Sequence, residues 1–223
     1  MSQPNLEQIA LQLESQDSRD RMLALVSLRE VSPEDAVPLI KKVLDDEVLQ
    51  VRSMAVFALG VKPTQESYPM LVKCLQTDPD YGIRADAAGA LGYLEDKRAF
   101  EPLVRAFYEE TQWLVRFSAA VALGNIGDIR AREALMEALY SQEAVMEQAA
   151  IAALGEIGAM DALDDILSFI DSEDWLVRQR LAEALGHLPC AKSLSALQYL
   201  TKDKHSQVRE AASIALDRAR PES

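Results

Sequence analysis

Apolar residues recur along the chain with the spacing of a helix face, and the same arrangement returns about every 31 residues. In one copy, Val51, Met54, Ala55, Ala58 and Leu59 stand at positions i, i+3, i+4, i+7 and i+8. This is the period of a single apolar helix stripe, whereas a strand would alternate apolar and polar residues. The segment is therefore predicted to be an amphipathic helix.

This helix belongs to a motif of the form Val-Arg-x-x-Ala-x-x-Ala-Leu-Gly that recurs in phase. Close copies begin at Val51, Ile83, Val115 and Val177, and weaker copies begin at Asp20, Met146 and Val208. The second position of the motif falls at residues 21, 52, 84, 116, 147, 178 and 209, with differences of 31, 32, 32, 31, 31 and 31. A fixed period of this size is typical of repeat proteins.

Each repeat is predicted to hold two helices, because a second apolar-periodic segment, such as residues 134–139 or 163–170, lies between successive copies. Small residues at fixed positions would let neighbouring hairpins approach closely; they are Ala55, Ala87, Ala119, Ala150 and Ala211. We expect a right-handed all-α solenoid of seven HEAT-like two-helix repeats.

The ends of the second helices carry recognisable stop signals. The inner copies close on glycines that are predicted to be left-handed C-caps, namely Gly60, Gly92, Gly124, Gly155 and Gly186. Three residues further on stand residues that do not readily continue a helix, namely Pro63, Gly127, Gly158 and Pro189.

The period runs through the chain without a linker, so residues 1–223 are predicted to form one domain. The outer copies have Arg29 and Asp217 where the inner copies have glycine, which is typical of terminal repeats. The extreme tails, residues 1–4 and 220–223, are expected to be disordered.

The charge balance argues against nucleic acid as a partner. The 223 residues include 23 Lys and Arg against 36 Asp and Glu, for a net charge of −13, and this charge opposes phosphate binding. No apolar run approaches the ~20 residues of a membrane span, and no leader pattern opens the chain. We expect a cytoplasmic protein, brought to a membrane surface only through partners if at all. Cys74 and Cys190 are expected to be ordinary thiols.

The in-phase arginines form one candidate site: Arg52, Arg84, Arg116, Arg178 and Arg209. One interpretation pairs them with acidic turn residues of the same or the adjacent repeat, each within about seven residues upstream, such as Asp45, Asp78, Glu109, Asp171 and Asp203. The other leaves part of the series free to bind carboxylates, such as tetrapyrrole propionates or an acidic loop of a partner. The structural interpretation is favoured because acids recur with the same period.

Aromatic side chains form a second candidate site. Three residues before the arginine position, the inner repeats carry Leu49, Tyr81, Trp113, Ala144 and Trp175. These rings could fasten one hairpin to the next, or they could form a row of exposed anchors. Phe57, Phe117 and Val121 are predicted to face the concave side, and for Phe117 an interaction role is favoured over packing.

No catalytic residue can be assigned. His187 and His205 lie in different repeats, which disfavours a metal pair, and no nucleophile–base order, phosphate loop or metal-ligand cluster is present in the sequence.

Four stretches carry a resemblance to a known family. Residues 122–131 (Ala-Leu-Gly-Asn-Ile-Gly-Asp-Ile-Arg-Ala), with Val-Arg opening each second helix, resemble the phycobilisome-lyase type of HEAT-like repeat. Residues 80–96, 98–108 and 174–186 are similar to the cyanobacterial phycobilisome-degradation proteins called non-bleaching B.

The resemblance implies a phycobiliprotein partner such as phycocyanin, and a bilin or other tetrapyrrole as the ligand if one is bound. A non-enzymatic scaffold in antenna turnover is favoured. The alternatives are a bilin lyase or chromophore-detaching factor and a generic HEAT interaction module. The residues that we expect to touch a partner or pigment are Tyr81, Arg84, Trp113, Arg116, Phe117, Trp175 and Arg178.

Overall fold

A computed structural model describes residues 5–219, in which all regular structure is helical. The chain divides into two compact units, residues 1–122 and 123–223, each described here by itself. That the two form a single domain stays a prediction. The tails expected to be disordered, residues 1–4 and 220–223, lie outside the described residues.

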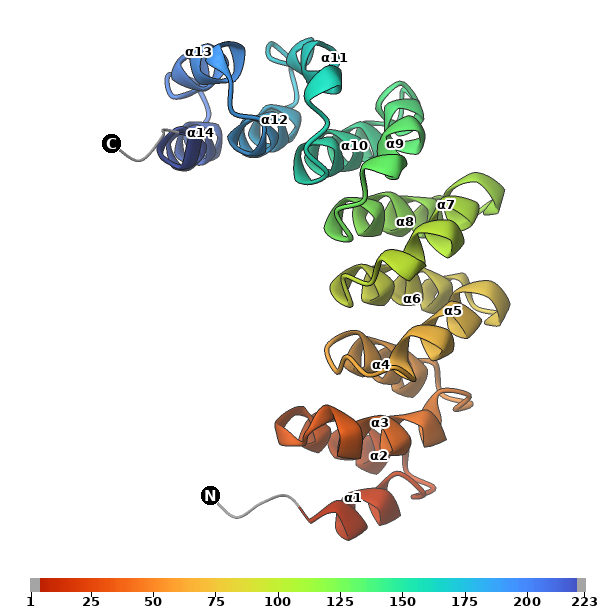
Figure 1. The fold of residues 1–223 in the computed structure, drawn as a ribbon. Helices are drawn as coiled ribbons and strands as arrows, with labels where there is room; N and C mark the ends of the chain where they lie inside the picture. Colours follow the sequence, from red (N-terminus) through yellow and green to blue (C-terminus); the bar gives the residue numbers. More distant parts are fainter. Residues whose placement is uncertain (1–4, 220–223) are drawn as a thin grey trace. The chain divides into compact units, whose positions relative to one another are not determined.

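The first unit contains the first four helical hairpins (Figure 1). Its α-helices are α1 Leu6–Gln12, α2 Ser18–Ser27, α3 Pro33–Ile40, α4 Leu49–Gly60, α5 Ser67–Thr77, α6 Tyr81–Tyr93, α7 Phe100–Glu109 and α8 Trp113–Asn125, the last of which runs past residue 122. Short 3-10 turns occupy Leu28–Glu30, Lys41–Val43 and Lys97–Ala99.

The second unit continues the pattern with three hairpins (Figure 1). Its α-helices are α9 Arg132–Leu139, α10 Ala144–Glu156, α11 Leu163–Leu167, α12 Trp175–His187, α13 Ala191–Leu200 and α14 Ser206–Ala219. Short 3-10 turns lie at Ile129–Ala131 and Met160–Ala162. The predicted α-solenoid of two-helix repeats is thus confirmed over the described residues.

The second helices of the repeats form a continuous layer in each unit, α2 on α4 on α6 in the first and α10 on α12 on α14 in the second. Ala55, Ala87, Ala119 and Ala150 are fully buried in this layer, as expected. In the last repeat the corresponding residue is Ala212, which is fully buried, and the prediction of Ala211 was wrong by one position.

Several second helices begin where a turn carboxylate caps them. The Asp80 side chain accepts hydrogen bonds from the amides of Gly82 and Ile83, and the Asp174 side chain accepts one from Leu176. These bonds satisfy backbone donors that have no partner inside the helix.

The prediction that the five motif glycines are left-handed caps was wrong, because all five belong to helices. Gly124 and Gly186 lie inside their helices, and the described glycines with positive φ are Gly127 and Gly158. A Cβ on Gly60, Gly124, Gly155 or Gly186 would come within 2.6 to 2.9 Å of an alanine in the next repeat. These glycines therefore allow close helix contact.

The left-handed residues lie three positions later, where the stop signals were expected. Gly127 has φ +62° and Gly158 has φ +70°, and the equivalent residue of the third repeat, Glu95, adopts φ +51° without being glycine. Across residues 5–219, no helix is long and apolar enough to cross a bilayer.

Candidate functional site

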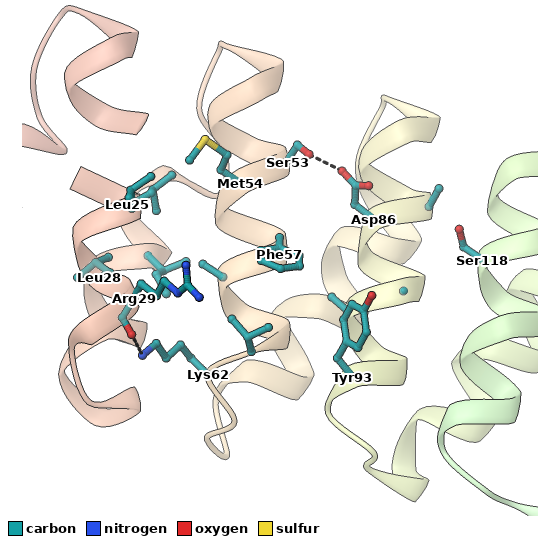
Figure 2. Close-up of a pocket in the computed structure, with 17 residues that line it drawn as sticks. Leu25, Leu28, Arg29, Ser53, Met54, Phe57, Lys62, Asp86, Tyr93 and Ser118 are labelled. Carbon is teal, nitrogen blue, oxygen red and sulfur yellow. Dashed lines mark hydrogen bonds between the residues drawn. The ribbon is translucent and has the colours of Figure 1, made fainter. Parts of the chain in front are cut away.

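An open groove runs across the second helices of the first unit (Figure 2). Its volume is about 960 Å³, within the usual range of ligand pockets. Its lining comes mainly from α2, α4 and α6, with Ser118 contributed by α8. Because these helices are rigid elements packed on one another, the groove is held open by the fold itself.

The floor of the groove is largely apolar. Phe57 and Tyr93 meet edge to face, with ring centroids 6.4 Å apart and an interplanar angle of 84°. Their exposed fractions are 57% and 59%, and Val26 of α2, which lines the same groove, is exposed at 56%. Adjacent exposed apolar side chains on one face are the usual mark of a binding surface. Figure 2 shows Phe57 between α4 and α6, with Met54 and Leu25 further toward α2.

The polar groups around this floor are mostly bonded to one another. The Ser53 hydroxyl donates to the Asp86 carboxylate at 2.6 Å, across from α4 to α6. The Lys62 ammonium donates to the backbone carbonyls of Arg29 at 2.7 Å and Val31 at 2.6 Å. These carbonyls follow the end of α2, where a cation is favourable. The Arg29 side chain is exposed at the same end of the groove.

The predicted arginine series is largely structural. Arg84 donates to both carboxylate oxygens of Glu110, at 2.6 and 3.2 Å, and to the carbonyl of Asp78 at 3.0 Å. Arg178 donates to Asp203 at 2.7 and 2.9 Å and also binds the carbonyl of Ser172. Such bidentate pairs fix both partners. The interpretation that pairs the arginines with turn acids is confirmed for these two residues.

The paired acids differ in part from those expected. The prediction that each arginine pairs with an acid a few residues upstream was wrong: Arg52 pairs with Asp78 at 3.4 Å, Arg84 with Glu110 and Arg178 with Asp203. Arg21, at the same repeat position, pairs with Asp46. In every case the acid belongs to the next repeat. The guanidinium also reaches backward to carbonyls of its own turn, so each arginine bonds two repeats together.

Some acidic residues that were expected to pair with the arginines have other partners instead. Asp45 lies 3.5 Å from the Lys73 ammonium, Glu109 accepts from Arg105, and Asp171 accepts from the hydroxyl of Tyr199. The last arginine of the series, Arg209, donates to the carbonyls of Asp203 and Lys204.

The ion pairs shift the ionisation of their members. The hydrogen bond from Arg178 holds the carboxyl pKa of Asp203 below its ordinary value, and the bond to Glu110 raises the guanidinium pKa of Arg84. Arg84 and Arg178 are therefore committed to structure, and a ligand carboxylate would have to displace a bidentate partner to bind them.

Arg116 lies in a different environment from these two. Its guanidinium carbon is 5.9 Å from the ring centroid of Phe107, near the outer limit of a cation–π contact, and the residue is half-buried.

The aromatic row divides into two kinds of residue. Tyr81 and Trp113 are exposed, at 48% and 54%. Trp175 is half-buried and stacks on His205 of the next repeat, with centroids 4.2 Å apart and planes 16° apart. Trp113 instead lies 6.5 Å from Phe117 on its own helix. Trp175 therefore packs two hairpins together, while Tyr81 and Trp113 are exposed.

Sequence reasoning found part of the groove and missed the rest. Phe57 is exposed as predicted, whereas Phe117 is half-buried. Tyr93, Met54 and Arg29 were missed, although their positions in the repeat place them on the same side of the second helices as Phe57. In the described part of the chain, His, Cys, Asp and Glu form no group of three or more suited to holding a metal ion.

Comparison with known proteins shows the family. A model of HEAT repeats matches residues 4–91, 68–149 and 133–217, so the chain belongs to the HEAT-repeat family. No curated protein matches the sequence significantly.

Solved structures confirm the same fold. A chain from the complex of CpcE and CpcF of phycocyanin lyase from Nostoc sp. PCC7120 is similar, with TM-score 0.67, 21% identity and coverage of 99% of this chain and 96% of that one. An engineered protein aligns with TM-score 0.58 and 23% identity over 96% of this chain and 68% of its own. A chain of the Kap95p–RanGDP complex aligns with TM-score 0.60 and 14% identity over 98% and 36%. At these identities the likeness is one of fold.

Proposed function

We propose that this protein is a binding scaffold for phycobiliproteins, such as phycocyanin, in phycobilisome degradation or antenna turnover. The observation that carries the proposal is the groove of the first unit, where Phe57 and Tyr93 are exposed together on rigid helices. Exposed aromatic rings of this kind are frequent anchors of protein interfaces.

The proposal that the partner is a phycobiliprotein rests on two similarities. One is the sequence resemblance of residues 80–96, 98–108 and 174–186 to the non-bleaching B proteins. The other is the fold shared with a chain of the CpcE–CpcF phycocyanin lyase complex. The scaffold would contact the protein part of the antenna and, in the fuller form of the proposal, its bilin chromophore.

A titration with purified phycocyanin tests the proposal. Wild-type protein is expected to bind, and the double variant Phe57→Ala with Tyr93→Ala to bind at least tenfold more weakly. Tyr199→Ala is the matched control, because Tyr199 has a similar exposure of 58% but lies in the second unit. Absence of binding by the wild type, or equal binding by the double variant, would refute the proposal.

The lyase alternative gains less support from the structure. It requires Arg84 or Arg116 to hold bilin propionates and Tyr81 to donate a proton, yet Arg84 is occupied by Glu110. Incubating chromophorylated phycocyanin with the protein and measuring free bilin against a heat-treated control decides the question, and release above that control would favour a detaching factor.

A further inference from the structure

The middle of α6 carries a glycine that helix packing does not require. Gly89 occupies the repeat position that holds Val26 in α2, Phe57 in α4 and Val121 in α8. Glycine destabilises a helix interior relative to alanine because it has more conformational freedom to lose. A glycine at this position therefore calls for a local explanation.

Close packing does not provide that explanation. A Cβ on Gly60, for comparison, would come within 2.9 Å of Ala90 in the next repeat, so Gly60 is sterically required. A Cβ on Gly89 would meet nothing within 4 Å, and Gly89 has no positive φ that would demand glycine. Gly89 instead leaves open space where the neighbouring helices project a side chain.

The open space is part of the groove. Gly89 lines it together with Phe57 and Tyr93, the two rings that meet edge to face. The missing side chain thus leaves a recess beside an aromatic pair, and we call this recess the Gly89 socket. A recess of this kind next to exposed rings can receive a large apolar group of a partner.

The polar side chains that line the groove restrict the kind of group that can bind in it. Ser53 is bonded to Asp86, and the Lys62 ammonium to two backbone carbonyls, so these groups need no bonds from a ligand. The rest of the lining is apolar surface, the hydroxyl groups of Tyr93 and Ser118, and the exposed Arg29 side chain. In a chain of net charge −13, a groove end with Arg29 and Lys62 is locally basic and favours an acidic neighbour.

We propose that the Gly89 socket receives one large apolar side chain of a partner protein, from a segment that places an acidic residue near Arg29. This inference rests on the proposed function for the location of the site and adds the chemistry that the site recognises. Satisfied polar groups and an apolar recess suit an anchor side chain, since a small polar ligand is usually held by several convergent free donors and acceptors.

The test compares three variants, all of them in the middle of second helices. Gly89→Leu fills the socket, Gly89→Ala fills little of it, and Ala152→Leu adds the same side chain at the equivalent position of α10 in the second unit. We expect Gly89→Leu to weaken phycocyanin binding at least tenfold, Gly89→Ala by less than threefold, and Ala152→Leu not at all. Thermal unfolding by circular dichroism should show Gly89→Leu at least as stable as wild type.

A second probe separates the socket from the choice of partner. The dye 8-anilinonaphthalene-1-sulfonate combines an aromatic body with an anion, and its fluorescence should rise with wild type and fall at least threefold with Gly89→Leu. Arg29→Gln should weaken binding of both probes about two- to fivefold at low salt and less at high salt.

The outcomes distinguish the two proposals. If the dye response depends on Gly89 but phycocyanin does not bind, the proposed function fails and the socket stands. If phycocyanin binds, and Phe57→Ala weakens it while Gly89→Leu does not, the socket is refuted. A third outcome is that free biliverdin binds, that Gly89→Leu abolishes this binding, and that apophycocyanin does not bind. This outcome would show that the socket holds a pigment and not a side chain of a partner protein.

Discussion

Arg178 and Asp203 form a nearly buried ion pair across two successive repeats, with the Arg178 Nε 2.7 Å from one carboxylate oxygen and side-chain exposures of 5% and 8%. Removing Asp203 would leave the guanidinium uncompensated in a poorly solvated place. Asp203→Ala is therefore expected to lower the free energy of unfolding by about 3 kcal/mol.

Urea unfolding followed by circular dichroism measures this loss. Glu109→Gln is the control, because it removes an exposed pair with Arg105, whose side-chain exposures are 67% and 62%. Its effect should stay within about 0.5 kcal/mol. Equal effects of the two variants would show that burial of the pair does not matter.

The same pair predicts a loss of stability in acid. The hydrogen bond from Arg178 holds the Asp203 pKa below its ordinary value of 3.8, so the folded state binds the proton less readily than the unfolded state. The ion pair contributes its full stabilisation above the pKa that Asp203 has in the unfolded state. This stabilisation is lost as the pH falls through that value toward the lower pKa of Asp203 in the folded state. Urea midpoints should drop between about pH 5 and pH 3. The drop should be smaller in Asp203→Asn, and an identical pH profile for that variant would contradict the linkage.

Two glycine substitutions should have opposite effects. In Gly155→Ala the new Cβ would come within 2.6 Å of the Ala184 Cα, and overpacking of this kind costs about 1 to 3 kcal/mol. In Gly89→Ala the new methyl meets open space, so the helix should gain about 0.5 to 1 kcal/mol. Thermal melts compare the pair, and destabilisation by both would mean that Gly89 is also packed.

The two thiols should differ in reactivity. Burial raises the pKa of Cys74 to about 11, while the side-chain hydrogen bond between Cys190 and Ser193 lowers the pKa of the half-buried Cys190. A disulfide-exchange reagent at pH 8 should therefore modify Cys190 rapidly and Cys74 only after denaturation. Cys190→Ser should abolish the rapid phase. A rapid phase that survives this substitution would place the reactive thiol at Cys74.

The two tryptophans should report different environments. Trp175 is stacked on His205, whereas Trp113 is 54% exposed. Acrylamide should quench the fluorescence of Trp113, observed in Trp175→Phe, more strongly than that of Trp175, observed in Trp113→Phe. Trp175→Ala should also cost at least about 1 kcal/mol through the lost stacking. Equal quenching in the two single-tryptophan proteins would contradict the stacked geometry.

The repeat architecture could be predicted because every repeat carries the same pattern of apolar residues. The spacing of Val51, Met54 and Ala55 identifies a helix face, and its return in phase identifies the hairpin stack. The role of the glycines could not be predicted in the same way. A left-handed helix cap and a close contact between two helices both favour glycine. Only the position of the neighbouring helix distinguishes these two roles, as the closeness of Ala153 does for Gly124.

The site was less predictable because it depends on turn geometry and on gaps between helices. Arg84 pairs with Glu110, 26 residues downstream, and not with Asp78 just upstream, a choice that charge periodicity does not resolve because acids recur on both sides of the arginine. The part of the groove around Gly89 was missed for a similar reason. Nothing in the sequence around Gly89 reveals that a side chain there would meet no neighbour.

The ion pairs between repeats must form in order from the N-terminus while the chain is being synthesised on the ribosome. Arg21, Arg84 and Arg178 each find their carboxylate 25 or 26 residues later. At about 5 to 20 residues per second, a newly made repeat waits for about one to five seconds before its acid is translated. Until then the arginine is bonded only to backbone carbonyls of its own turn. Each hairpin is therefore completed by its successor, and folding that begins at the ribosome would advance one repeat behind the growing end.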